Sequence, residues 1–407
     1  MMPRCGLHKR LIRLLIVWCI APVGWAAMAH AERTLIPLPE VIVDPNEGTT
    51  VGFLPVVLIA SDNKAIRSII APDVRYNDIT GVYPTFRFFD YPTPKQKYLL
   101  IAGKGTSRGE YAEATYVGED LDDGRFDLQA SGRREQDPFE RFFGFGNNTD
   151  GSKETNFTST TNAATVFAAL NLPASLQATV QARLRQVQIG HGGVSSLPQL
   201  RDPKSGFSNV PGANGATIIG PRFGIAYDTR DVTDIPTQGV FLNGNVEVID
   251  EALGSSTSFV KYGLEGKGYV PLRPDKNYII ALHAQADYLQ HGDNVPFFEK
   301  NSVGGIHSLR GFGSNRFTDN DRFLLQGELR SNVYEREIFG VRAHLELAPF
   351  LDVAKVFHSS REFLLEDLHV VGGLGVRAVV EPQVVAYIDV GTAGGAPAAF
   401  TGIDYPF

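Results

Sequence analysis

The sequence predicts an all-β fold, a transmembrane β-barrel of sixteen antiparallel strands. Three observations predict it. The chain begins with the features of an export signal, polar and apolar residues then alternate in segments of about ten residues, and short connections alternate with long ones. These features are typical of a bacterial outer-membrane barrel, in which backbone donors and acceptors are paired between neighbouring strands.

Residues 1–31 are expected to form a secretory signal peptide. Four basic residues within 1–13 precede an uncharged apolar run over 14–29, and the small residues Ala29 and Ala31 provide cleavage positions. Cleavage would remove both cysteines, so the exported chain would have no disulfide or thiolate chemistry. It would also make the chain more acidic than the net charge of −7 of the whole sequence, so no nucleic-acid partner is expected.

The alternation of side chains separates an apolar face from a polar one. In 239–249, Val240 and Leu242 fall on one face, whereas Asn243 and Glu247 fall on the other. A soluble β-sandwich would also alternate. Small residues on the apolar faces and charges of both signs on the polar faces favour a barrel with lipid outside and a wet lumen inside.

Turn residues leave 32–64 as an extended periplasmic lead segment and divide the barrel, 65–407, into sixteen candidate strands. These are 65–74, 80–90, 96–106, 109–118, 124–134, 154–169, 174–190, 215–229, 239–250, 256–271, 277–291, 322–334, 339–356, 368–380, 383–392 and 398–407. With both termini periplasmic, most connections on that side are short, whereas the outer side carries long loops such as 292–321. A barrel in the outer membrane is expected to sort its loops in this way.

The last candidate strand ends on an aromatic residue. Tyr405 and Phe407 share one face of it. A terminal aromatic strand resembles the signal by which barrel-assembly machinery recognises its clients. That machinery is therefore an expected partner in the insertion of this chain.

The loop 292–321 contains the run Leu309-Arg310-Gly311-Phe312. It resembles the (V/I/L)RG(F/Y) motif of the BamA/TamA-like outer-membrane assembly and secretion superfamily, also called the bacterial surface antigen family. In that family the motif lies in the sixth extracellular loop, between strands eleven and twelve of sixteen, which is the place of 292–321. Further runs resemble family motifs: 143–149, 327–330, 350–354 with Ala354 where glycine is usual, and a periplasmic turn with Asp228, Arg230, Asp231 and Gly239.

The resemblance implies that the sixth loop folds into the lumen and is held there by Arg310. A long loop needs an anchor to become ordered, and an arginine offers a planar fork to carboxylates. Glu328 and Asp352 lie on the lumen faces of adjacent strands, and Arg377 on the next strand also faces inward. Gly311 and Gly313 are expected to let the loop turn, with Phe312 packed on the wall. The alternative is an ordinary solvated charge at Arg310.

Family members that assemble or secrete proteins carry periplasmic capture domains, and 32–64 is too short for one. We therefore expect a short, barrel-only member in the outer membrane, in contact with its lipids. The resemblance implies insertion or export of proteins or lipids, with client proteins or a separate periplasmic partner. The alternative is a passive or gated channel, or a structural surface antigen.

No enzymatic activity, cofactor or metal is expected. The G-x-S-x-G run at 105–109 falls at a predicted hairpin tip, without the strand–turn–helix that a nucleophile elbow requires. His283 and His344 lie on different strands, and no cysteine and histidine spacing indicates a zinc site.

Overall fold

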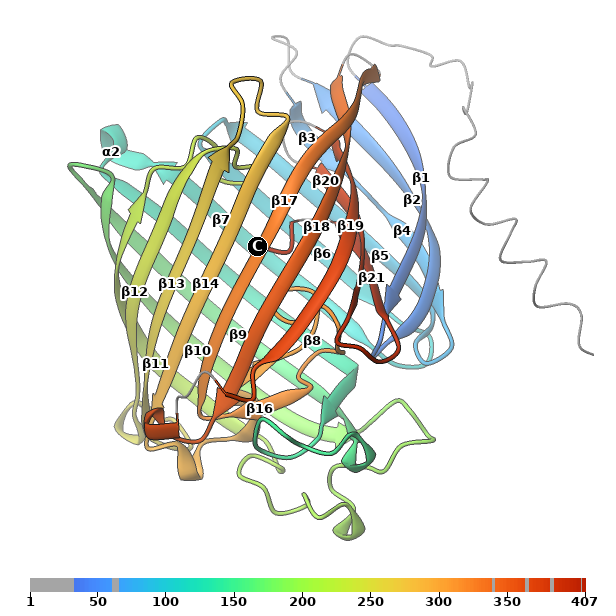
Figure 1. Cartoon of the computed structure of the whole chain (residues 1–407), viewed down its shortest axis with the longest axis vertical. Helices are drawn as coiled ribbons and strands as arrows, with labels where there is room; N and C mark the ends of the chain where they lie inside the picture. Colours follow the sequence, from blue (N-terminus) through green and yellow to red (C-terminus); the bar gives the residue numbers. More distant parts are fainter. Residues whose placement is uncertain (1–32, 61–65, 339–340, 363–365, 381–383, 404) are drawn as a thin grey trace, which may run out of the picture.

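The computed structural model describes residues 33–60, 66–338, 341–362, 366–380, 384–403 and 405–407, and the expected signal peptide, 1–31, lies outside them. Within this part of the chain, one antiparallel sheet holds nineteen strands and a second sheet holds two. The large sheet curls until its first and last strands lie side by side, which makes a barrel (Figure 1). The prediction of an all-β antiparallel fold is confirmed.

The strands of the large sheet follow the chain in order. They are β1 (Arg33–Asp44), β2 (Gly48–Ala60), β3 (Ile66–Ile70), β4 (Asp73–Asn77), β5 (Gly81–Thr93), β6 (Gln96–Lys104), β7 (Glu110–Asp120), β8 (Phe126–Phe142), β9 (Thr155–Leu172), β10 (Leu176–His191), β11 (Ala216–Asp228), β12 (Gly239–Ile249), β13 (Phe259–Pro271), β14 (Tyr278–Gln290), β17 (Asp321–Ile338), β18 (Val341–Phe357), β19 (His369–Val380), β20 (Val384–Thr392) and β21 (Ala398–Ile403). The small sheet pairs β15 (Asn301–Val303) with β16 (Phe317–Asp319).

Helical structure is limited to short turns. These are α2 (Leu121–Gly124), η2 (Gly151–Lys153), η3 (Pro203–Ser205), η4 (Glu251–Leu253), η5 (Gly292–Asn294), η6 (Phe297–Glu299) and η7 (Ser360–Glu362). Among the described residues, none of the helices is long and apolar enough to cross a membrane.

The alternation along each strand decides which side chains face outward. On β12, Leu242 is 52% exposed on the outer surface, whereas Glu247 is buried in the lumen. On β13, Leu264 is 65% exposed, whereas Lys261 contacts lumenal groups. The outer surface of the barrel wall is thus apolar and its inner surface polar, the reverse of a soluble domain.

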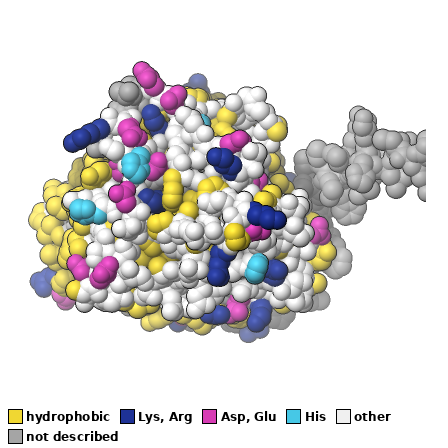
Figure 2. All heavy atoms as spheres, turned by 90° about the horizontal axis from the view of Figure 1, so that it is seen from below, with side chains coloured by type: hydrophobic (Ala, Val, Ile, Leu, Met, Phe, Trp, Pro, Cys, Tyr) yellow, Lys and Arg dark blue, Asp and Glu magenta, His cyan; other side chains and the backbone are white. Residues whose placement is uncertain are grey.

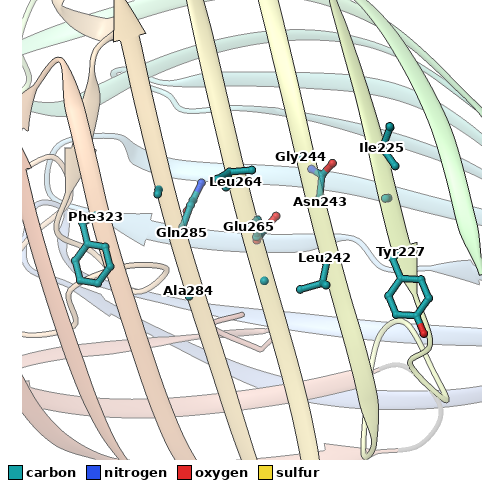
Figure 3. Close-up of a pocket in the computed structure, with 13 residues that line it drawn as sticks. Ile225, Tyr227, Leu242, Asn243, Gly244, Leu264, Glu265, Ala284, Gln285 and Phe323 are labelled. Carbon is teal, nitrogen blue, oxygen red and sulfur yellow. The ribbon is translucent and has the colours of Figure 1, made fainter. Parts of the chain in front are cut away.

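A shallow apolar groove crosses the outer face of β11 to β14. Gly244 and Ala284 leave it low, and the side chains of Leu242 and Leu264 form its ridges (Figure 3). A Cβ atom added at Gly244 would lie 3.4 Å from a methyl carbon of Leu264, so the small residue lets the leucine lie flat against the sheet. The groove is a feature of the outward surface.

The two ends of the barrel differ. The turns after β5, β9 and β13 are short and lie at one end, whereas the loops after β8, β10 and β14 are long and lie at the other (Figure 1). We call these the turn end and the loop end. Seen from the loop end, charged side chains of both signs are spread over the surface (Figure 2).

The expected lead segment over 32–64 is wrong for residues 33–60. These residues form the hairpin β1–β2, which belongs to the sheet because β2 pairs with β3 and β4. β3 and β4 together take the place of one strand in the sheet, since both pair with β2 on one side and with β5 on the other. The hairpin therefore adds two strands that the sixteen expected strands do not include.

The expected final strand over 398–407 is also wrong in its last part. β21 ends at Ile403, and the chain then enters the lumen. Tyr405 packs against Val379 and Val385, and Phe407 packs against the apolar cluster around Tyr269. The terminal aromatic residues therefore do not lie on the lipid-facing side of a strand.

Candidate functional site: the lumenal loop and its two anchors

The loop between β14 and β17, residues 291–320, is called the lumenal loop below. It turns sharply at Gly304 and Gly305, whose φ angles of +121° and +89° favour glycine. A Cβ atom at Gly304 would lie 2.2 Å from the carbonyl oxygen of Gly313 across the turn. The sharp turn therefore lies at these two glycines rather than at Gly311 and Gly313, where it was expected.

Arg310 anchors this loop to the wall and is fully buried. Its Nε and Nη2 atoms donate to the two carboxylate oxygens of Asp352 at 2.8 and 2.7 Å. Its Nη1 atom donates to Glu328 at 3.1 Å and to Asp389 at 2.9 Å. The guanidinium also lies 3.6 Å from the ring centroid of Phe350. One arginine of the loop is thereby bound to β17, β18 and β20.

Arg377 on β19 completes the arrangement. Both its Nη atoms lie 2.7 Å from the carboxylate oxygens of Glu328, and Nη1 also donates to Glu346 at 3.3 Å. Arg330 donates to the same Glu328 at 2.7 Å. We call Arg310, Glu328, Asp352, Arg377 and Asp389 the Arg310 cluster. Each buried charge of this cluster is paired with an opposite charge, as burial requires, whereas the Nε atom of Arg377 and the Oδ1 atom of Asp389 have no hydrogen-bond partner among the described residues.

The structure thus brings together Arg310 with Glu328, Asp352 and Arg377, the residues that the sequence pointed to. It adds Asp389, which the sequence analysis missed. A signal was present, because Asp389 is the acidic residue in the otherwise apolar run over 384–391 of β20. An acid at that place in a barrel strand indicates a lumenal position.

The rest of the motif packs the loop against the wall. Leu309 is fully buried in an apolar cluster with Phe317, against which Phe312 also packs. The rings of Phe312 and Phe317 meet edge to face at 5.2 Å. A Cβ atom on Gly311 would lie 2.8 Å from a methyl carbon of Val371, so glycine is needed for the close approach to β19. The four residues bring the loop backbone against the barrel wall.

A second anchor ties the loop to the other side of the lumen. Glu299 of η6 is buried, and its carboxylate accepts from Arg183 at 2.8 Å and from Arg185 at 2.9 Å. Lys261 on β13 lies 3.4 Å from it. Burial acts to raise the pKa of Glu299, but Lys261, Arg183 and Arg185 outweigh burial and hold that pKa well below its usual range. Glu299 was not among the residues that the sequence pointed to.

The expected motif at the turn end forms a compact turn between β11 and β12. Arg230 donates from Nη2 to Asp228 at 2.6 Å, and its guanidinium lies 4.8 Å from the ring centroid of Phe241. Gly239 closes the turn with a φ of +103°, and a Cβ atom there would lie 2.2 Å from the carbonyl oxygen of Thr229. These residues give the turn its shape.

Asp231 accepts several hydrogen bonds within the same turn. The backbone amides of Thr237 and Gln238 donate to it at 2.9 and 3.2 Å, and Lys276 of the next turn donates at 3.0 Å. Burial acts to raise the pKa of Asp231, but the hydrogen bonds from Thr237 and its other donors outweigh burial and hold the pKa well below its usual range. The carboxylate joins two neighbouring turns.

The C-terminal residues contact both the wall and the lumenal loop. The hydroxyl of Tyr405 donates to Glu346 at 3.1 Å, and Arg330 donates to the carbonyl oxygen of Phe407 at 3.3 Å. His307 of the loop lies 2.9 Å from the carbonyl oxygen of the residue before Phe407. The chain end therefore contacts the lumenal loop. The recognition of Tyr405 and Phe407 by assembly machinery stays a prediction.

Comparison with known proteins places the chain in a family. The Omp85 superfamily domain matches residues 97–373. The chain belongs to the Omp85 superfamily. The resemblance to BamA/TamA-like barrels seen in the sequence is thereby confirmed, and the Arg310 motif and its lumenal partners lie on an Omp85 barrel.

The following relative and solved structures match the chain and share little of its sequence. The outer membrane protein assembly factor BamA of Nitratidesulfovibrio vulgaris strain Hildenborough is 29% identical over 163 residues, which are 38% of this chain and 20% of that protein. The crystal structure of Haemophilus ducreyi BamA lacking POTRA domains 1–3 superposes with a TM-score of 0.53 at 14% identity, over 91% of this chain and 75% of that one. CdiB from Acinetobacter baumannii gives a TM-score of 0.45 at 11% identity, over 92% of this chain and 59% of that one.

Proposed function

We propose that this chain is an integral outer-membrane barrel that helps to insert or export proteins or lipids through a seam between β1 and β21. The observation that carries this proposal is the way the two strands meet. The amide of Val43 donates to the Thr401 hydroxyl at 2.8 Å, and that hydroxyl donates to the carbonyl of Val41 at 2.8 Å. Among the described residues, β1 and β21 are not joined by a ladder of backbone hydrogen bonds.

The sequence of β1 supports a weak seam. Backbone groups of a strand point alternately to its two neighbours, so the parity of Val41 and Val43 directs Pro39 and Pro37 to the β21 side. A proline has no amide hydrogen to donate, which is why prolines are confined to sheet edges. Opening the seam would break few hydrogen bonds of about 0.5–1.5 kcal/mol each, whereas other neighbouring strands share long ladders.

The anchored lumenal loop supports a lateral route over an axial one. The lumenal loop is bound to β17, β18 and β20 through Arg310 and to β10 and β13 through Glu299. Moving the loop aside for an axial path would break both anchors. A gated channel, with this loop as its gate, is the alternative, and in that case truncating Arg310 should raise a steady conductance.

The relatives suggest the kind of client but do not identify it. One relative is named an outer membrane protein assembly factor, and this chain matches 20% of its length. We propose outer-membrane lipids as the surroundings of the barrel, barrel-assembly machinery for its own insertion, and client proteins or a separate periplasmic partner for its action.

A reversible cross-link tests the seam. Both native cysteines lie in 1–31, so Val43→Cys with Thr401→Cys places one engineered pair across the seam. The matched control combines the same Thr401→Cys with Ile388→Cys, its registered neighbour on β20. Cells whose only copy of this protein carries the seam cysteine pair should show the outer-membrane composition of cells that lack the gene. A reductant should restore the wild-type composition. Wild-type composition with the seam cross-linked would contradict the proposal.

A further inference from the structure

Four basic side chains line one wall of the lumen where the loop touches it. Arg183 and Arg185 come from β10, Arg222 from β11 and Lys261 from β13. We call these four residues the basic cradle. All four side chains point into the lumen, because each residue lies at one of the alternate positions of its strand at which polar side chains face inward.

Glu140 on β8 lies within electrostatic reach of Arg185. Among the described residues, Glu247 on β12 is the one wall carboxylate that forms an ion pair with the cradle. Arg183 donates to it from Nε at 2.6 Å and from Nη2 at 3.2 Å, and Arg222 donates at 3.2 Å. Four cations against one wall carboxylate leave an excess of positive charge in a partly buried place. Like charges held this close repel each other unless an anion lies between them.

The anion now present comes from the loop. Glu299 lies between Arg183, Arg185 and Lys261, and its carboxylate is the group that the three cations share. It does not use all the donors. The Nε atoms of Arg185 and Arg222 are buried without a hydrogen-bond acceptor in the described part of the chain. The cradle thus offers more donors and more charge than one carboxylate accepts.

We infer that the basic cradle is a binding site for a phosphate group, and that Glu299 occupies it as an internal substitute while the loop is anchored in the lumen. A phosphate carries up to two negative charges and more acceptor oxygens than a carboxylate, and arginine forks bind it bidentately. When the loop withdraws, the cradle keeps its wall position, because its side chains belong to strands. The group would be free phosphate or the phosphate of a lipid headgroup. The inference rests on this geometry and does not require the seam to open.

Removing the internal carboxylate tests the inference. The folded full chain in detergent micelles is titrated with inorganic phosphate by calorimetry, as wild type and as Glu299→Ala. Glu299→Ala should bind phosphate at least tenfold more tightly than wild type. Asp293→Ala is the matched control, because it removes a carboxylate from the same loop whose side chain is 87% exposed, and it should bind like wild type.

Two further variants keep the test decisive. Adding Arg185→Ala to Glu299→Ala should abolish the gained binding. If Glu299→Ala does not fold, Glu299→Gln keeps the shape and removes the charge, and it should show the same direction of change. Competition by dihexanoylphosphatidic acid at a lower concentration than phosphate would identify a lipid headgroup as the source, and binding of phosphate alone a soluble anion. Equal binding by folded wild type and by the folded Glu299 variant, or binding by neither, would overturn the inference.

Discussion

Truncating Arg310 should destabilise the barrel more than any exposed substitution. Arg310→Ala removes the two side-chain bonds to Asp352, one bond to Glu328 and one to Asp389. Asp352 then keeps the Arg310 backbone amide at 3.1 Å and the Gln326 amide at 3.3 Å, with no cation beside it. Removing one partner of a buried ion pair leaves the other charge unpaired and typically lowers the free energy of unfolding by about 3–5 kcal/mol.

Arg310→Lys separates charge from geometry. A lysine keeps the positive charge but loses the planar fork that spans both Asp352 oxygens, so the expected loss is about 1.5–3 kcal/mol, the range for a hydrogen bond to a charged group. Arg125→Ala is the matched control, because the Arg125 side chain is 71% exposed. A surface substitution of this kind should change stability by less than about 0.5 kcal/mol.

The assay is urea unfolding of the refolded chain in detergent micelles, followed by circular dichroism. Wild type and Arg125→Ala should unfold at the highest urea concentration, Arg310→Lys at a lower one and Arg310→Ala at the lowest. Equal midpoints for Arg310→Ala and Arg125→Ala would refute the reasoning that the loop is held in place by this residue.

Three further predictions use the same unfolding measurement. Gly311→Ala should lower the free energy of unfolding by about 1–3 kcal/mol through overpacking against Val371, whereas Gly395→Ala, where an added Cβ meets nothing within 4 Å, should not. Glu299→Gln should be less stable than wild type at neutral pH, and this difference in stability should shrink below pH 4.5, the ordinary pKa of a glutamate. The reason is that the pKa of Glu299 in the folded protein lies below that value, so the stability that its charge contributes is lost on acidification. A difference in stability that does not depend on pH would contradict this. Burial, reinforced by Asp44 and Asp137, raises the pKa of Glu47 to about 7. The wild-type protein should therefore lose stability as the pH rises from 4.5 through 7. Glu47→Gln should be more stable than wild type at pH 8 and as stable as wild type at pH 4.

Local patterns were enough to predict most of the barrel. Period-two alternation gives the faces of a strand directly, which is why Glu328 and Asp352 could be placed in the lumen from the sequence. The hairpin β1–β2 was missed because its prolines suggested an extended lead. In the structure Pro37 faces Pro55 in the register of that hairpin, next to the seam, where a missing amide hydrogen is tolerated.

Other features depend on contacts between distant residues. Glu299 looks like a solvated loop charge until β10 and β13 bring Arg183 and Lys261 beside it. The inward path of Tyr405 and Phe407 depends on lumenal partners such as Glu346 and Arg330, which alternation places on the right face without saying what they bind. Alternation also continues to the last residue, so it could not show that β21 ends at Ile403.

The outer-membrane proteome of the source bacterium, measured with and without this gene, tests the proposed function most directly. If the chain assists insertion or export, its loss should deplete a defined set of outer-membrane or surface proteins, or alter the outer-membrane lipids, and the wild-type gene should restore them. An unchanged outer membrane would contradict this account and would favour a channel or a structural surface protein.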